Sequence, residues 1–225
     1  QPSTTPTPTQ EEANPTLYLH PGLSPTFLSQ LDLTPFNLTR DPSLTNLQLN
    51  LAPIKADVDG PIWVYSLVAP FFTTTDYVSL NDLQTLWRGE SSGELPFSQL
   101  HLTAETLAAQ SVLWGEPGEN SITVMTQDEL AAIAATSEPI LAILPFEDLS
   151  PRWKVLRVED QSPIDTHFDP RAYPLSLQIQ LAGQDINLAL TLPPSNYDPQ
   201  LRTVLVMTGV TALVRATAYR MALNG

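Results

Sequence analysis

Five hydroxyl side chains stand in turns that follow apolar segments, where a chain of this type could bind a small ligand. They lie in the turns 21–26, 70–79 and 125–128. In open α/β sheets, ligands settle beyond the carboxyl ends of strands, where hydroxyls and the backbone N–H groups of helix starts donate hydrogen bonds. An alternative stays open, that hydroxyls such as Ser24 and Thr126 only cap their own helices. The candidate ligand-binding residues are Ser24, Thr26, Thr73, Thr74 and Thr126.

The sequence contains no motif of a standard enzyme. His20, His101 and His167 lack the paired spacing of a zinc site, and cysteine is absent, so thiolate catalysis and Cys-ligated metals are excluded. There is no GxSxG elbow, Walker loop or GxGxxG turn. We therefore predict no catalytic residue, no metal site and no cofactor for this chain.

The carboxylates and tryptophans have ordinary explanations. The pairs Glu147/Asp148 and Glu159/Asp160 lie on predicted turns, where solvated charge is the usual interpretation. The tryptophans fall on predicted strands or helices, which favours core packing over ligand stacking. They are Trp63, Trp87, Trp114 and Trp153.

Charge excludes some partners. The 225 residues carry a net charge of −14, and the first 150 residues hold only three of the ten basic side chains. Phosphate groups need cationic counter-charge, so we expect no nucleic-acid partner. No stretch of about 18 apolar residues is present, so no membrane span is predicted.

Short apolar runs alternate with helical patterns, which predicts an α/β fold. Ser24 before Pro25, Ser79 and Thr126 are typical helix starts. The predicted strands are Leu17–His20, Leu47–Ala52, Trp63–Ala69, Gln99–Leu102, Ser121–Met125, Ile140–Leu144, Trp153–Val158, Leu175–Leu181, Ile186–Leu192 and Thr203–Thr208.

The composition also predicts domain boundaries. Residues 1–16 are rich in Thr and Pro without a large apolar side chain, which indicates a disordered tether. Such a leader is typical after a cleaved signal or a lipidated cysteine, so we expect an exported bacterial protein with an N-terminal membrane tether. An arbitrary chain boundary is the alternative. The loop 193–199 is the predicted end of the main domain, 17–198, because the acidic side chains stop at Asp198.

Four segments carry a family resemblance. They are WVYSLVAPFFTTTDYVSLNDLQTLWRG (63–89), ILAILPFEDLSPRWKVLRVEDQSPI (140–164), FDPRAYPLSLQIQLAG (168–183) and VLVMTGVTALVRATAYRMALNG (204–225). Together they resemble the N-terminal region of CapA-family proteins, which act in poly-γ-glutamate capsule biosynthesis. The resemblance implies a role at the cell surface and a downstream CapA catalytic domain as a partner.

Three shorter stretches are similar to type 2 periplasmic solute-binding proteins of the phosphate-binding kind. These stretches are SLNDLQTLWRG, LAILPFEDL and YPLSLQIQL. The resemblance implies a two-lobed α/β fold with mixed sheets, crossover strands and a ligand in the cleft, which closes by hinge motion. Only Arg40, Lys55 and Arg88 are basic before residue 150. A cationic or neutral ligand, a peptide-like polymer or no ligand therefore fits better than free phosphate.

The last segment has two interpretations. CapA catalytic domains resemble metallophosphatases, whose first strand ends in Gly-Asp with the Asp as metal ligand. Gly209-Val210 stands at the corresponding place, so the resemblance implies that this ligand is missing and that the chain has no phosphatase activity. Residues 199–225 are then either the truncated start of such a domain or the last strand and helix of the binding domain.

Three functions follow from these observations. The first is a non-catalytic extracytoplasmic domain of a CapA-like protein that binds a ligand or regulates polymer handling. The second is a fragment or degenerate copy of a metal-dependent hydrolase. The third is a spacer or protein-docking domain with a filled cleft. Metal-dependent turnover would favour the second, and the absence of any stabilising ligand would favour the third.

Overall fold

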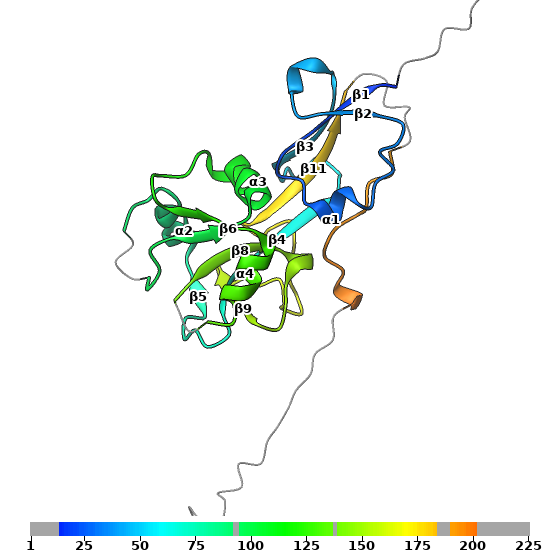
Figure 1. Ribbon diagram of the computed structural model, residues 1–225. Helices are drawn as coiled ribbons and strands as arrows, with labels where there is room; N and C mark the ends of the chain where they lie inside the picture. The colour runs from blue at the N-terminus through cyan, green and yellow to red at the C-terminus, as the bar shows by residue number, and fades with distance from the viewer. Residues whose placement is uncertain (1–13, 92–94, 137–138, 184–189, 202–225) are drawn as a thin grey trace, which may run out of the picture.

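The computed structural model describes residues 14–91, 95–136, 139–183 and 190–201, which form an α/β fold with two lobes (Figure 1). The strands are β1 (Thr16–Leu19), β2 (Asn37–Thr39), β3 (Leu47–Pro53), β4 (Ile62–Pro70), β5 (Tyr77–Val78), β6 (Leu100–Leu102), β7 (Ile122–Val124), β8 (Leu141–Pro145), β9 (Trp153–Val155), β10 (Arg157–Val158) and β11 (Ser176–Ala182). The α-helices are α1 (Pro25–Leu28), α2 (Leu80–Trp87), α3 (Ala104–Trp114) and α4 (Gln127–Ile133). Short 3-10 helices are η1 (Pro42–Leu44), η2 (Phe146–Asp148) and η3 (Pro199–Leu201).

Strand β4 crosses from one lobe to the other. Its first residues, 62–64, pair with β11 of the first lobe, which also holds β1, β2 and β3. Its residues 65–70 pair with β8 and β9 of the second lobe, which also holds β6 and β7 (Figure 1). The predicted two-lobed fold with mixed sheets and a crossover strand is confirmed.

Strand directions decide which turns face the interlobe space. β1 runs parallel to β3, and both run in the direction of β4, because β11 is antiparallel to β3 and to β4. In the second lobe, β8 is antiparallel to β4, whereas β6 and β7 run parallel to β8. The carboxyl ends of β1 and of β6, β7 and β8 therefore point toward one another from opposite lobes.

Burial explains why the apolar runs become strands. β4 is buried at all positions after Ile62, and β8 is buried at all five of its positions. A strand covered on both faces needs a continuous apolar run, whereas the alternating burial of β3 is typical of a strand with one covered face. The buried central strands thus form a hydrophobic core that connects the two lobes.

Helix starts follow the predicted caps. The hydroxyls of Ser24, Ser79 and Thr126 each accept a hydrogen bond from a backbone N–H in the first turn of α1, α2 and α4. Thr103 caps α3 in the same way. Each cap satisfies a donor that has no partner within its own helix, which fixes where the helix begins.

Helix α3 lies against strands of both lobes. It follows β6 in the second lobe, yet it contacts β3 of the first (Figure 1). Gly22, in the turn after β1, sits so close to this helix that a Cβ atom would lie 2.6 Å from the backbone N of Ala109. The absence of a side chain at Gly22 permits this backbone approach between the lobes.

Several predicted boundaries shift. β1 begins at Thr16, which the sequence placed in the tether, and residues 1–13 of that tether lie outside the described residues. The predicted strand Trp153–Val158 is two strands, because the chain leaves β4 after Leu156, whose N–H donates to Leu67, and turns toward β5. Strands β2 and β5, each of three residues or fewer, were not predicted.

The C-terminal part is described only up to Leu201. The loop 193–199 runs beside the start of β4, where Ile62 N–H donates to the carbonyl oxygen of Pro194 at 3.3 Å. The segment 190–192 has no strand assignment, and the rest of the predicted strand Ile186–Leu192 lies outside the described residues. The predicted strand Thr203–Thr208 and the pair Gly209-Val210 also lie outside them.

Candidate functional site

A cleft of about 600 Å³ opens where the carboxyl ends of strands from the two lobes meet. The first lobe contributes the start of α1, and the second contributes the starts of α3 and α4 and the end of β8. We call this hollow the interlobe cleft. It is lined by Ser24, Pro25, Thr26, Thr103, Ala104, Glu105, Val124, Met125, Thr126, Gln127, Glu129, Pro145 and Asp148.

Three of the five candidate residues line the interlobe cleft. Ser24 and Thr26 approach it from the first lobe and Thr126 from the second. Ser24 and Thr126 also cap their helices, so the capping role and a place in the cleft are not exclusive. Hydroxyls from both lobes therefore face one hollow, which is the arrangement that a ligand-binding cleft requires.

Thr73 and Thr74 are not in this cleft. They line a separate pocket of about 210 Å³ with Pro70, Phe72 and Phe97. They follow the carboxyl end of β4, and β4 is antiparallel to β8, so its end lies at the opposite edge of the sheet. The structure therefore brings Ser24, Thr26 and Thr126 to the interlobe cleft but not these two residues, whose role in ligand binding stays a prediction.

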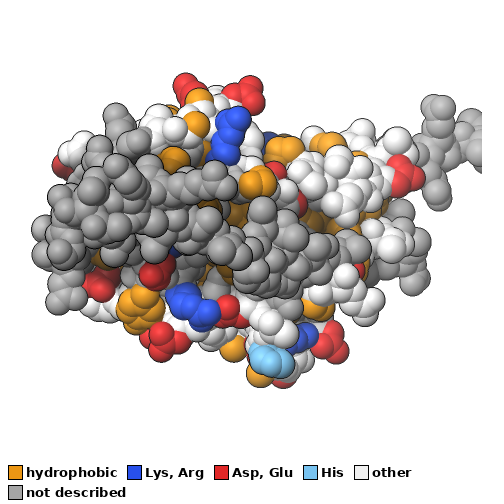
Figure 2. Space-filling model, turned by 90° about the horizontal axis from the view of Figure 1, so that it is seen from below, with side chains coloured by type: hydrophobic (Ala, Val, Ile, Leu, Met, Phe, Trp, Pro, Cys, Tyr) orange, Lys and Arg blue, Asp and Glu red, His pale blue; other side chains and the backbone are white. Residues whose placement is uncertain are grey.

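The interlobe cleft is acidic. Its described lining contains the carboxylates of Glu105, Glu129 and Asp148 but no Lys, Arg or His. Glu129 completes a capping box, and the hydrogen bonds from Thr126 hold the pKa of its carboxyl below the usual range. On the face in Figure 2, Lys and Arg side chains lie among Asp and Glu rather than in one basic patch.

Asp148 is the cleft carboxylate with a raised pKa. Burial of this half-buried side chain raises its pKa to about 6, and the neighbouring charge of Glu147 adds to the effect. The side chain thus keeps its charge at pH 7 at a cost in stability. Unfavourable charges that a fold retains in a cleft are typical of functional sites.

Glu147 receives three side-chain hydrogen bonds from distant parts of the chain. Ser24 Oγ and Trp63 Nε1 each donate to its Oε1 at 3.0 Å. Asn196 Nδ2 donates to its Oε2 at 2.5 Å. These contacts join the first lobe, the crossover strand and the C-terminal loop to η2 of the second lobe.

Glu147 and Asp148 were predicted as solvated charge on a turn and not as site residues. Their place on a turn is confirmed, since both belong to η2, but they are not merely solvated charge. Glu147 is hydrogen-bonded between the lobes, and Asp148 lines the cleft. The available signal was their position directly after the apolar run of β8, at a carboxyl strand end where ligands settle. Trp63 is buried, as expected for a core residue, and its indole N–H also holds Glu147.

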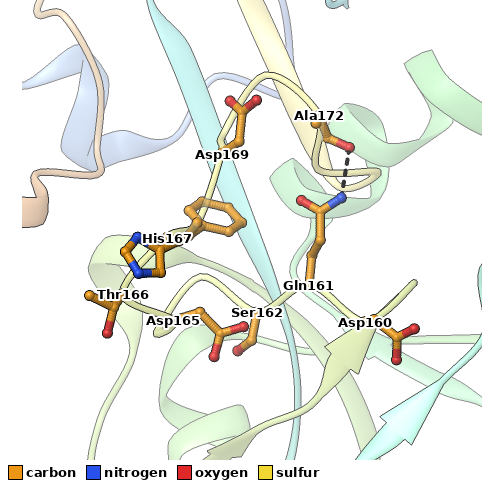
Figure 3. Close-up of a pocket in the computed structure, with 9 residues that line it drawn as sticks. Asp160, Gln161, Ser162, Asp165, Thr166, His167, Asp169 and Ala172 are labelled. Atoms are coloured by element: carbon orange, nitrogen blue, oxygen red, sulfur yellow. Dashed lines mark hydrogen bonds between the residues drawn. The ribbon is translucent and has the colours of Figure 1, made fainter.

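A second hollow of about 480 Å³ lies in the loop after β10 (Figure 3). Its lining comes from one continuous segment, 160–172, in which Gln161 Nε2 donates to the carbonyl oxygen of Ala172 at 3.3 Å (Figure 3). Asp165 forms a two-point ion pair with Arg157, at 2.6 and 2.8 Å. Because one loop forms this hollow and both lobes form the interlobe cleft, we take the cleft as the candidate site.

The described residues were also compared with the requirements of a metal site and of a membrane-spanning helix. Within the four described ranges, no three His, Asp or Glu side chains are arranged to hold a metal ion. None of the helices described there has the length and apolar composition needed to cross a membrane.

The architecture defines a type 2 periplasmic-binding-protein-like fold, and comparison with solved structures agrees. The chain is similar to an ABC-type phosphate transport receptor from Vibrio cholerae, with a TM-score of 0.52 and 9% identity over 76% of this chain and 88% of that one. A Clostridium perfringens protein assigned as a phosphate ABC transporter substrate-binding protein, solved with phosphate bound, has a TM-score of 0.50 and 10% identity over 77% and 87%. A possible phosphate-binding protein from Planctomyces limnophilus gives 0.50 and 11% over 75% and 80%. At these identities the likeness concerns the fold.

No family model matches the sequence, and no curated protein matches it. The predicted resemblance to solute-binding proteins is thus supported at the level of fold, and the resemblance to the CapA family stays a prediction.

Proposed function

We propose that this chain is an extracytoplasmic, non-catalytic solute-binding or regulatory domain that holds a neutral or cationic ligand in the interlobe cleft. The observation that carries the proposal is the cleft itself, which is lined by polar side chains from both lobes. Lobes joined by a crossover strand can close over a ligand by a hinge motion. The solved structures of similar fold include one with phosphate bound, which supports a solute-binding role for this architecture.

The charge of the cleft argues against free phosphate as the ligand. Glu105, Glu129 and Asp148 line it, and no described lining residue is basic. Two like charges 4 Å apart repel by about 4 kcal/mol at the effective dielectric typical of protein surfaces. A phosphate would meet this repulsion without a compensating cation, whereas an amine would be attracted by the same carboxylates. Val124 and Met125 add apolar surface that suits the hydrocarbon part of an organic ligand.

We further propose, from the sequence resemblance, that the domain belongs to a CapA-like protein that handles poly-γ-glutamate or a related surface polymer. An acidic cleft would repel a polyglutamate chain as it would phosphate. The role that fits best is therefore regulatory, with a small neutral or cationic effector in the cleft. An N-terminal lipid tether and a downstream CapA catalytic domain remain the partners proposed for it.

Thermal-shift and calorimetric titration of the purified chain test the proposal. The probes are inorganic phosphate, sulfate, single amino acids, short peptides, and diamines or polyamines. We expect an amine or a neutral probe to raise the melting temperature with a saturating dependence, and phosphate to give no shift at millimolar concentration. Phosphate binding in the micromolar range would contradict the proposal. A chain that responds to no probe would favour the spacer function, and metal-dependent hydrolysis would favour the enzyme.

A matched pair of variants tests whether a probe binds in the interlobe cleft. Glu105→Gln removes a carboxylate from the lining of the cleft, and Glu119→Gln makes the same change at an exposed position outside it. For a cationic probe that binds, we expect Glu105→Gln to weaken binding about tenfold and Glu119→Gln to leave it unchanged. Equal affinities for the two variants would show that the probe binds elsewhere.

A further inference from the structure

The three donors around Glu147 form a built site for one carboxylate group. Ser24 and Trp63 are almost fully buried, at 4% and 1% exposure, and both point a donor at the same oxygen, Oε1. Asn196 supplies the donor to the other oxygen, Oε2. The two oxygens of one carboxylate are therefore held by donors that lie 49, 84 and 123 residues from Glu147 along the chain.

Two of the three donors, those of Ser24 and Trp63, have no other acceptor among the described residues, whereas Asn196 Nδ2 also donates to the carbonyl oxygen of Val64. The indole N–H of Trp63 donates only to Glu147 in that part of the chain, and the hydroxyl hydrogen of Ser24 is directed to the same carboxylate. A buried donor without an acceptor loses its hydration and gains nothing in return. The site is thus arranged for an anion, although the cleft beside it is acidic.

A hollow of about 330 Å³ adjoins the Glu147 carboxylate and lies next to the interlobe cleft. Trp63, Glu147 and Asn196 line it, and Thr26 lines both this hollow and the interlobe cleft. Because the hollow is beside the carboxylate, a small molecule could reach the donors if the Glu147 side chain were shortened. We call Ser24, Trp63 and Asn196 the donor cradle.

We propose that the donor cradle is a carboxylate-binding site that the chain fills with its own Glu147, and that Glu147 thereby excludes anionic ligand groups from the cleft. Glu147 is then a specificity-determining residue of the proposed binding function. The role of Glu147 in specificity rests on the proposed binding function, whereas the occupation of the donor cradle by Glu147 does not.

The charges facing the cradle predict which free anion it would accept. Asp148, next in sequence, and Asp198, in the lining of the hollow, add negative charge nearby. No Lys, Arg or His is among the described residues that line the hollow. A small monoanion with two oxygens, such as acetate or formate, fits these conditions better than a phosphate dianion, which carries more charge and needs more donors.

Chemical rescue of Glu147→Ala tests the cradle. The variant leaves the donors in place and vacates the volume of a carboxylate, so we expect its melting temperature to fall by several degrees. Sodium acetate at 1–50 mM, with ionic strength held constant by NaCl, should restore a large part of the loss with a saturating dependence. The wild-type chain and a Glu119→Ala variant should show no acetate-specific shift.

The outcomes are distinct. A folded Glu147→Ala chain without an acetate-specific shift would overturn the cradle, and so would an equal shift in the wild type. In the double variant Glu147→Ala, Trp63→Phe, one donor is lost. The acetate concentration needed for half of the rescue should therefore rise at least threefold. Rescue by acetate in a chain that binds no cleft probe would leave the cradle standing while the proposed binding function fails.

A second variant decides the matter if Glu147→Ala does not fold. Glu147→Gln keeps the side-chain volume but replaces a charged acceptor with a neutral one. We expect the indole N–H proton of Trp63, assigned in NMR spectra by the Trp63→Phe variant, to shift upfield by a few tenths of a ppm, because its hydrogen bond weakens. An unchanged indole resonance would show that Glu147 does not occupy the cradle in solution.

Discussion

The side-chain amide of Asn196 forms two hydrogen bonds with the backbone of Val64, one as acceptor and one as donor. The N–H of Val64 donates to Asn196 Oδ1 at 2.8 Å, and Asn196 Nδ2 donates to the carbonyl oxygen of Val64 at 2.9 Å. Val64 is fully buried and stands where β4 passes from one lobe to the other. A single amide thus takes the place of a neighbouring strand at the crossover.

Replacing this amide should destabilise the fold. Asn196→Ala leaves a buried backbone donor and acceptor of Val64 without partners, and it also removes the bond to Glu147. We expect a loss of about 2–3 kcal/mol in the free energy of unfolding, measured by urea denaturation. Asn50→Ala, which breaks only a side-chain contact to Gln48 on β3, is the control and should cost about 0.5 kcal/mol or less. Equal losses would argue against a structural role for Asn196 at the crossover.

Asp148 should make stability depend on pH. Its pKa in the folded chain is about 6, above its ordinary value of 3.8, so between these pH values the folded chain keeps a proton that the unfolded chain has released. The free energy of unfolding should therefore fall as pH rises through this window and stay lower above it. Because Asp148 is half-exposed, solvent screening reduces this loss to about 1 kcal/mol.

The variant Asp148→Asn isolates that effect. It removes the charge, so it should be about 1 kcal/mol more stable than the wild type at pH 7.5 and equally stable at pH 4, by urea unfolding at both values. Glu119→Gln, at an exposed position, should change stability little at either pH. A wild type as stable as Asp148→Asn at pH 7.5 would contradict the raised pKa.

Gly22 should be intolerant of a side chain. A Cβ atom there would lie 2.6 and 2.8 Å from the backbone N and Cα of Ala109, and backbone atoms cannot rotate away. We expect Gly22→Ala to lower the free energy of unfolding by about 2–3 kcal/mol in thermal or urea unfolding. Gly115→Ala is the comparison, because Gly115, with φ 74° and ψ −167°, has no atom beyond its chain neighbours within 4 Å of its Cβ position. Its loss of about 1–3 kcal/mol should therefore come from backbone strain alone and not from a clash between the lobes. A mild Gly22→Ala would indicate that the lobes move apart easily at this contact.

Ser66 should be replaceable by alanine without loss. It is fully buried in β4, and its hydroxyl has no hydrogen-bond partner among the described residues. Removing an unpaired buried hydroxyl should leave stability unchanged or raise it by about 1 kcal/mol. Ser121→Ala is the matched test, because the equally buried Ser121 donates to the carbonyl oxygen of Gly118 at 2.8 Å, and its loss should cost about 1 kcal/mol. A clear destabilisation by Ser66→Ala would reveal a partner for its hydroxyl.

Much of the fold could be predicted from local patterns. The apolar run at Leu141–Pro145 becomes a buried central strand, and the caps at Ser24 and Thr126 begin helices where predicted. These features depend on residues close in sequence, so the hydrophobic pattern and the capping hydroxyls are sufficient to define them. The same reasoning failed at Trp153–Val158, where the partner strand changes from β4 to β5 within one apolar run.

The composition of the candidate site was decided by tertiary structure. Local sequence patterns predict an acidic α/β chain with hydroxyls after its strands. Only strand direction decided that Thr26 and Thr126 line one cleft while Thr73 lies at the opposite edge of the sheet, because β4 runs antiparallel to β8. Likewise, the environment of Glu147 depends on donors that lie 49, 84 and 123 residues away. Hydrogen bonds over such separations form only when the crossover strand and the C-terminal loop bring their segments together, and no local pattern encodes that geometry.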